Sequence, residues 1–139
     1  MKKLFLILIV LLDITIQGYS SPNDEKYVLL KYKVHSITEC VIQNDQLYEG
    51  KTYTNINSLI CVTDDEVMIV ADNGIKVSFL IAKSEFDKDG GLVFTTYRLP
   101  DYKKLIILLD HFENDKYTFS FIDTSKSKCY VYITEFLKQ

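Results

Sequence analysis

The sequence has no tryptophan, and it has only five glycines, two prolines and two histidines among 139 residues. This scarcity of glycine and proline excludes collagen-like and proline-rich architectures. A formal net charge of -3 argues against a dedicated nucleic-acid-binding protein, so we expect no nucleic-acid partner. With 47% apolar and 25% charged residues, the chain has the composition of one globular domain.

Sequence motifs of the common enzyme classes are also lacking. No G-x-S-x-G, H-E-x-x-H, G-x-x-x-x-G-K or G-x-G-x-x-G occurs. The two histidines, His35 and His111, share no local motif with a cysteine, as a Cys–His nucleophile would need. We therefore expect no enzymatic activity and no cofactor. A hydrolase using dispersed carboxylates or the two histidines is the catalytic alternative.

The N-terminus, in contrast, carries the pattern of a secretory leader. Two lysines precede an unbroken apolar run over Leu4–Leu12, and a mixed stretch with small residues at Gly18 and Ser20 follows. This order predicts a signal peptide over residues 1–20, cleaved between Ser20 and Ser21. Asp13 ends the apolar run well short of the ~20 residues that a membrane-spanning helix needs, which disfavours an uncleaved anchor.

We expect residues 21–139 to form a single exported domain, either periplasmic or secreted. This part has 14 basic and 18 acidic side chains, because the leader contains two of the basic and one of the acidic residues. An acidic domain is not attracted to anionic membranes. It also contains no further apolar run long enough to span a bilayer, so the mature form is not expected to cross a membrane.

The exported part reads as β-strands, because apolar and polar side chains alternate along it with a period of two, as at 75–81 and 116–121. The predicted strands are 27–34, 58–63, 66–71, 75–81, 92–99, 105–109, 116–121 and 128–133, with a short additional strand at 40–43. Residues 102–110 are the best helix candidate, but their β-branched residues disfavour a helix. A short C-terminal turn is considered at 135–139.

Turn signals separate these strands, including Asp72-Asn73-Gly74, 63–65, 87–91, 113–115 and 123–126. Short strands joined by short turns predict an all-β fold, an antiparallel meander that forms a small sandwich or barrel of about eight strands. The expected core consists of Leu29, Leu59, Val67, Ile69, Ile75, Val77, Phe79, Phe94, Ile106, Leu108, Phe119, Phe121 and Val131.

Three cysteines, Cys40, Cys61 and Cys129, lie in the exported part, where disulfides can form. An odd number allows one intramolecular pair and one free thiol, and the sequence does not select the pair. The favoured interpretation is that cysteines in apolar strands, such as Cys61 and Cys129, are small core residues.

One acidic segment resembles a calcium-binding loop. Glu85, Asp87 and Asp89 occupy positions one, three and five of such a loop, and Gly90 follows at position six. Position twelve is Thr96, where a bidentate glutamate is required, and the flanks predict strands and not helices. We interpret the segment as a solvated hairpin tip and expect no metal site, with these three carboxylates as the weak candidate ligands.

Tyrosines are the more suggestive candidates for binding. Tyr130 and Tyr132 are expected on the face opposite Val131, and Tyr48 and Tyr53 lie in a polar stretch. Exposed tyrosines supply rigid, amphipathic contact area to protein and ligand interfaces. The alternative is that they pair across strands on the second face of a sheet.

Residues 41–80 combine a Leu47-Tyr48-Glu49-Gly50 turn, a strand at 58–62 and an aspartate-glycine hairpin at 66–77. In this order they resemble the periplasmic β-domain of FecR-type sigma regulators. The resemblance implies a similar run of hairpins in an exported binding domain. The chain lacks that family's cytoplasmic anti-sigma part and mid-chain membrane helix, so the regulatory function is not carried over.

Three functional hypotheses follow from these patterns. The first is a small exported β-domain that binds a protein or an envelope component without catalysis. The second is a calycin-like barrel that holds a small apolar ligand, which requires a closed barrel with an apolar cavity. The third is the dispersed-residue hydrolase.

Overall fold

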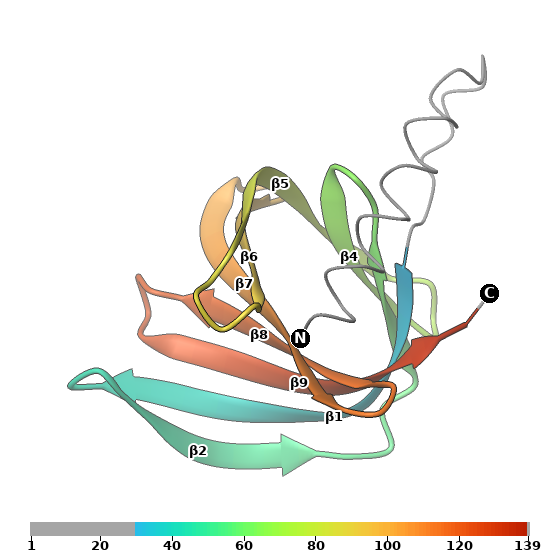
Figure 1. The fold of residues 1–139 in the computed structure, drawn as a ribbon, viewed down its shortest axis with the longest axis horizontal. Coiled ribbons are helices and arrows are strands. Elements are labelled where there is room, and N and C mark those ends of the chain that lie inside the picture. The colour runs from blue at the N-terminus through green and yellow to red at the C-terminus, as the bar shows by residue number, and fades with distance from the viewer. Residues whose placement is uncertain (1–29, 139) are drawn as a thin grey trace.

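The computed structural model describes residues 30–138, which form nine antiparallel strands. The strands are β1 (Leu30–Gln43), β2 (Gln46–Tyr53), β3 (Ser58–Val62), β4 (Glu66–Ala71), β5 (Lys76–Phe86), β6 (Leu92–Arg98), β7 (Lys103–Glu113), β8 (Lys116–Asp123) and β9 (Lys128–Leu137). They lie in the order β2-β1-β3-β4-β5-β6-β7-β8-β9, and β1 also pairs with β9 (Figure 1). The predicted all-β meander is confirmed, and it closes into an eight-stranded barrel with β2 as one extra strand.

The long strand β1 closes the barrel because it has three neighbours. Its first residues, 30–33, pair with β3, whereas residues 37–43 pair with β2. Along its other edge, β1 pairs with β9 over most of its length. A β-bulge between Val34 and Ser36 interrupts that pairing, and a bulge bends a strand and increases its twist. Beyond the bulge β1 stays paired with β9 but has β2 in place of β3 on its other edge, so β2 is an extra strand at the side of the barrel (Figure 1).

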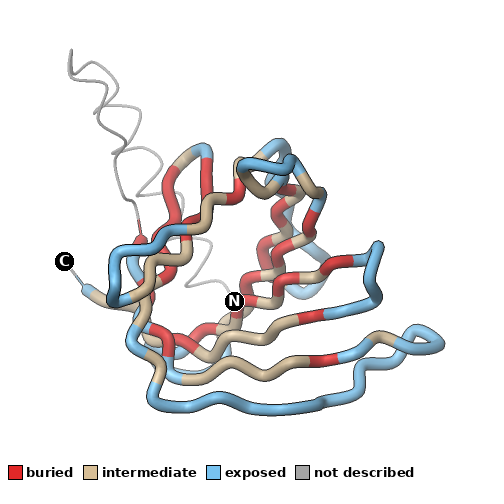
Figure 2. Tube along the Cα trace, turned by 180° about the vertical axis from the view of Figure 1, so that it is seen from behind, coloured by how far each residue is buried: buried red, intermediate tan, exposed pale blue. Residues whose placement is uncertain are grey.

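The predicted turns are present, and one further turn was missed. Gly74 has a φ of 86° in the β4–β5 turn, the left-handed region that glycine adopts without steric cost. The missed turn joins β1 to β2 through Asn44 and Asp45, whose φ angles of 52° and 61° are typical of a tight hairpin. Every residue of β2 is exposed, so no apolar alternation marks this strand in the sequence (Figure 2).

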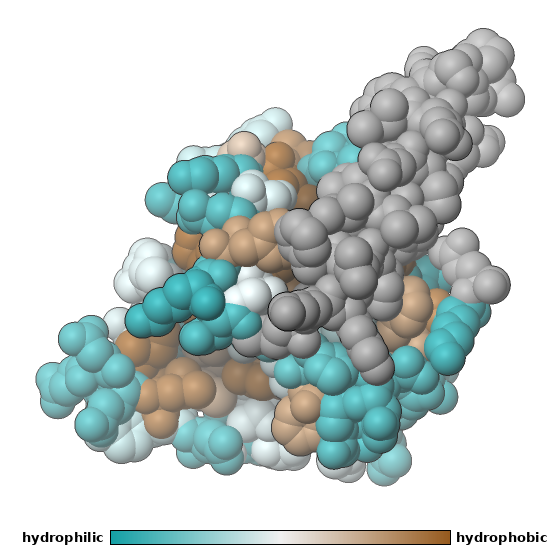
Figure 3. Space-filling view, viewed as in Figure 1, coloured by the Kyte–Doolittle hydropathy of each residue, from teal (hydrophilic) through white to brown (hydrophobic). Residues whose placement is uncertain are grey.

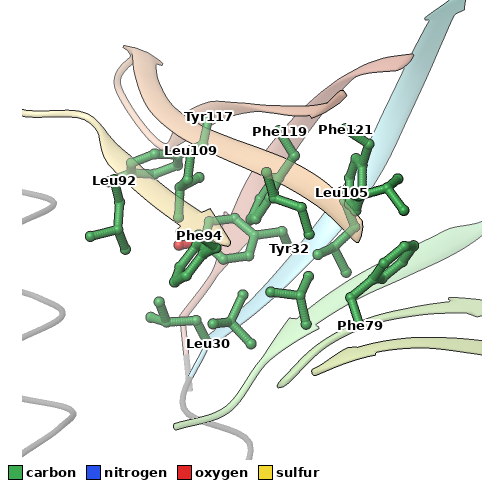
Figure 4. Packing of buried hydrophobic residues seen from close by; sticks show 14 of the residues in the cluster. Leu30, Tyr32, Phe79, Leu92, Phe94, Leu105, Leu109, Tyr117, Phe119 and Phe121 are labelled. Carbon is green, nitrogen blue, oxygen red and sulfur yellow. The ribbon is translucent and has the colours of Figure 1, made fainter. Parts of the chain in front are cut away.

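The barrel interior is filled by side chains. Val67, Phe79, Phe94, Phe119 and Phe121 are buried there as predicted, and Ile69 and Val77 pack against them. Figure 4 shows Tyr32 among the labelled rings and aliphatic side chains of the core. Thr96 and Thr134 are also fully buried, and each hydroxyl donates to a backbone carbonyl, those of Leu105 and Tyr117, at 2.9 Å.

Several predicted core residues do not face the core, and in each case the adjacent residues of the same strand face it instead. Leu59, Ile106, Leu108 and Val131 are only partly buried and face outwards. Their neighbours fill the interior instead, including Ile60, Leu105, Ile107 and Leu109. In a continuous apolar run the sequence does not determine which set of alternate residues faces inwards, and the sheet pairing decides it. Hydrophobic and hydrophilic residues are interspersed over the outer face in Figure 3.

Three further predictions have other outcomes. Ile75 was expected in the core but lies in the β4–β5 turn with 64% of its surface exposed, because the strand begins only at Lys76. The C-terminal turn considered at 135–139 is wrong, since β9 continues to Leu137. Leu29 lies outside the described residues.

The hydroxyl of Tyr32 is buried and makes no hydrogen bond with a described residue. Its ring contacts those of Phe119, at 4.8 Å between centroids, and Tyr117, at 5.5 Å. A buried hydroxyl without a partner costs free energy, so we expect Tyr32→Phe to raise the free energy of unfolding by about 1 kcal/mol. Equilibrium urea unfolding measures this, with Tyr97→Phe on the surface as the control. A loss of stability in Tyr32→Phe would mean that a buried water satisfies the hydroxyl.

Candidate binding site at one end of the barrel

A cavity of about 180 Å³ opens at one end of the barrel, where the β4–β5, β6–β7 and β8–β9 turns lie. Its apolar lining comes from Ile69, Phe79, Leu105 and Phe121, of which the last three are buried core residues. Figure 4 shows Phe79, Leu105 and Phe121 together on one side of the core, away from Leu92 and Leu109. The closed barrel therefore ends in a hollow that is apolar on the side of the core, which we call the barrel mouth.

Charged and aromatic residues complete the lining of the barrel mouth. They are Arg98, Asp123, Lys126, Lys128, Tyr130 and Tyr132. Alternation along the strands explains this change of character, because on β8 the inward positions run from Phe119 and Phe121 to Asp123, the last residue of the strand. On β6 they run likewise from Phe94 to Arg98. Inward positions become charged where each strand leaves the core.

Asp123 is held in its ionised form by its partners. Lys103 Nζ lies 2.7 Å from Asp123 Oδ2, and Ser125 Oγ donates to Asp123 Oδ1 at 2.7 Å. Burial of the carboxyl opposes its ionisation, but these hydrogen bonds outweigh burial and lower the pKa of Asp123 to about 2. The Asp123 carboxylate also accepts from the backbone N–H groups of Ser125 and Lys126, and thereby fixes the β8–β9 turn.

Arg98, the single arginine of the chain, is also paired. Its Nη2 and Nε atoms donate to the two carboxylate oxygens of Asp101 at 2.6 and 3.2 Å. These hydrogen bonds raise the pKa of Arg98 and lower that of Asp101. In contrast, no ion pair with another described residue involves Lys126 or Lys128. Among the residues that line the cavity, the three cations Arg98, Lys126 and Lys128 and the single carboxylate of Asp123 leave two positive charges in excess.

Tyr130 and Tyr132 lie on the face opposite Val131, as predicted, but this face points inwards and lines the barrel mouth. They point inwards and pack against the core, while Val131 between them faces outwards. Burial, and then the neighbouring Tyr130, raises the pKa of Tyr132 to about 12, so its hydroxyl is protonated at neutral pH. The sequence placed the two tyrosines on one face, but it assigned the buried side of the strand to Val131.

Tyr53 and Tyr48 lie on the same face of the sheet, on β2. Tyr53 is opposite Ile37, which is itself opposite Tyr132, and the Tyr53 hydroxyl donates to Glu39 Oε1 at 3.1 Å. Tyr48 is opposite Val41, and its hydroxyl donates to Gln46 at 3.0 Å. Directly opposed side chains share a face, so the four predicted tyrosines lie on one face of the sheet across β2, β1 and β9, with Tyr48 and Tyr53 exposed. Two of them line the cavity, and two lie beyond it.

The cysteines are buried, free thiols. Cys40 on β1 and Cys129 on β9 are directly opposed, whereas Cys61 lies on β3. Burial raises the pKa of all three thiols, that of Cys129 to about 11, which disfavours the reactive thiolate. None of the three lines the barrel mouth.

Two of the three candidate metal ligands, Glu85 and Asp87, serve other interactions. Glu85 lies 3.5 Å from Lys83, and the Asp87 carboxylate accepts from the backbone N–H groups of Asp89 and Gly91 at 2.8 Å. Asp110 on β7, which the sequence did not suggest, approaches the same turn, and its pKa is raised by burial and then by Asp87 and Asp89. Among residues 30–138 no group of three or more His, Cys, Asp or Glu residues is arranged to hold a metal ion.

The two histidines are not brought together. His35 on β1 lies 3.0 Å from Glu135, and His111 on β7 contacts the carbonyl of Asn114. Strands β8 and β9 lie between β1 and β7, a separation of three strand spacings or roughly 14 Å. The described residues therefore do not form the histidine site that the hydrolase hypothesis would require.

The predicted leader over residues 1–20 lies outside the described residues. Within the part of the chain that is described, no helix has the length and apolar character to cross a membrane. Comparison with protein-family models, with curated proteins and with solved structures gave no match. No finding bears on the resemblance of residues 41–80 to FecR-type β-domains, which stays a prediction.

Proposed function

We propose that the protein acts by non-catalytic binding, and that the barrel mouth holds one small, largely apolar molecule. The observation that carries this proposal is the cavity of about 180 Å³ with an apolar floor and two tyrosines in its lining. A cavity of about 150 Å³ lined by aliphatic and aromatic residues is enough to hold benzene. The ligand is therefore no larger than a substituted ring or a short aliphatic chain.

The packing of the barrel supports a ligand at the mouth and not at the centre. Tyr32, Val34, Ile107, Leu109 and Phe119 are fully buried inside the barrel, where they occupy the space that a deep ligand would need. An eight-stranded barrel has an interior that side chains can fill or that one small ligand can occupy. Here side chains fill it, and space remains at one end.

The proposal is tested by filling the cavity. Ile69 lines the barrel mouth, so Ile69→Phe places a larger side chain in the space of the ligand. We expect it to weaken binding of a benzoate-sized aromatic molecule by at least about tenfold, measured by NMR titration. Ile75→Phe, in the exposed β4–β5 turn, is the matched control and should bind as the wild type does. Equal affinity in both variants would contradict binding at this end.

A protein partner is a second candidate, and β2 favours it. All eight residues of β2 are exposed, and its outer edge has no partner strand among the described residues. An exposed edge can accept a strand from another protein through backbone hydrogen bonds. A partner bound at β2 would be insensitive to Ile69→Phe, which distinguishes the two candidates. In either case, the predicted leader suggests that binding occurs after export.

A further inference from the structure

We infer that the molecule held in the barrel mouth is an anion, namely a small aromatic or aliphatic carboxylate; this inference rests on the proposed function. The argument begins with the charges of the lining. Lys126 and Lys128 line the cavity together with the apolar floor, and neither forms an ion pair with a described residue. A carboxylate attached to an apolar group would fit this lining. Its apolar part would contact the floor, and its charged oxygens would form charge-assisted hydrogen bonds with the two lysines.

The nearby carboxylates do not neutralise these two lysines. Asp123 is directly opposite Lys128 across β8 and β9, but its oxygens are engaged by Lys103 and Ser125. Asp101 is similarly engaged by both donor atoms of Arg98. The barrel mouth thus has an excess of positive charge in a chain with a formal net charge of -3. This local charge is opposite in sign to that of the whole protein, which would attract an anion to this end in particular.

Two uncharged hydrogen-bond donors lie in the cavity beside the positively charged side chains. Tyr130 and Tyr132 line the same cavity, and a protonated phenol can donate a hydrogen bond to a carboxylate. Burial holds the Tyr132 hydroxyl in its protonated form at neutral pH. The backbone of the β8–β9 turn, which carries Lys126, is fixed by hydrogen bonds to Asp123, so this lysine extends from an ordered turn. A neutral ligand would leave both ammonium groups without an anionic partner.

The experiment compares two ligands of nearly equal shape, benzoate and benzamide, by NMR titration at low ionic strength. We expect the wild type to bind benzoate at least about tenfold more tightly than benzamide. In the double variant Lys126→Gln/Lys128→Gln this preference should fall to about twofold or less. The control is Lys88→Gln/Lys33→Gln, which removes the same total charge from exposed positions away from the cavity and should keep the preference.

The possible results separate the inference from the proposed function. Equal affinity of the wild type for benzoate and benzamide, with both lost in Ile69→Phe, would overturn the anion but support the barrel mouth as the site. A benzoate preference that survives Lys126→Gln/Lys128→Gln would support an anionic ligand but overturn the role of these two lysines, because another cation of the lining would then be responsible. Failure of both molecules to bind would contradict the proposed function itself.

Discussion

Replacing Phe119 by alanine is expected to lower the free energy of unfolding by about 3–5 kcal/mol. The Phe119 side chain is fully buried in the middle of β8. Its ring packs edge-on against Tyr32, at 4.8 Å between centroids, and stacks near Phe121 at 6.4 Å. The substitution removes these contacts and leaves a void, and a barrel whose strands are hydrogen-bonded all round cannot easily collapse into it.

Equilibrium denaturation with guanidinium chloride measures this loss, and Phe112→Ala provides the matched control. Phe112 lies at the end of β7 with 57% of its surface exposed, so its truncation should change stability by no more than about 0.5 kcal/mol. A loss below about 1.5 kcal/mol for Phe119→Ala would indicate a loosely packed interior. It would then be necessary to reconsider whether the barrel centre is closed to ligands.

The second large effect is expected at Asp123. Asp123→Asn at pH 7 should lower the free energy of unfolding by about 1–3 kcal/mol, because it leaves the Lys103 ammonium with no anionic partner at a largely buried position. The side chains of Lys103 and Asp123 are 21% and 11% exposed. Asp101→Asn is the matched control at the same end of the barrel. The Arg98–Asp101 pair is more exposed, so its loss should cost no more than about 1 kcal/mol.

The stabilisation by Asp123 should depend on pH, and it should decrease as the pH falls. The pKa of Asp123 is lowered from an ordinary value of 3.8 to about 2 in the folded protein. Its ionised form therefore stabilises the fold fully above pH ~4, and this stabilisation is lost as the pH falls from about 4 to about 2. Wild type and Asp123→Asn should converge in stability over that window, measured by urea unfolding at each pH. A difference that stays constant down to pH 2 would contradict the assigned role of the carboxylate.

The candidate site shows where the sequence pattern was informative and where it was not. Tyr130 and Tyr132, which were predicted as binding residues, line the cavity, whereas none of the charged residues of the lining was predicted. A signal for two of them was present, because the alternation that places Phe119 and Phe121 inwards continues to Asp123, and the one that places Phe94 inwards continues to Arg98. Lys128 carried the same kind of signal, because it alternates in step with Tyr130 and Tyr132 along β9. Lys126 carried none, since a turn position has no fixed periodicity.

The sequence by itself determined the strands other than β2, most of the turns and the all-β class, because alternation and turn chemistry are local properties. Only the tertiary structure decided which face of an apolar run is buried, as for Ile107 against Ile106 and Leu108. It alone also decided that β1 meets β9 and closes the barrel. The residues that line the barrel mouth come from six different strands and one turn. They come together because the barrel closes, and its closure depends on the pairing of β1 with β9, which are about a hundred residues apart in the sequence.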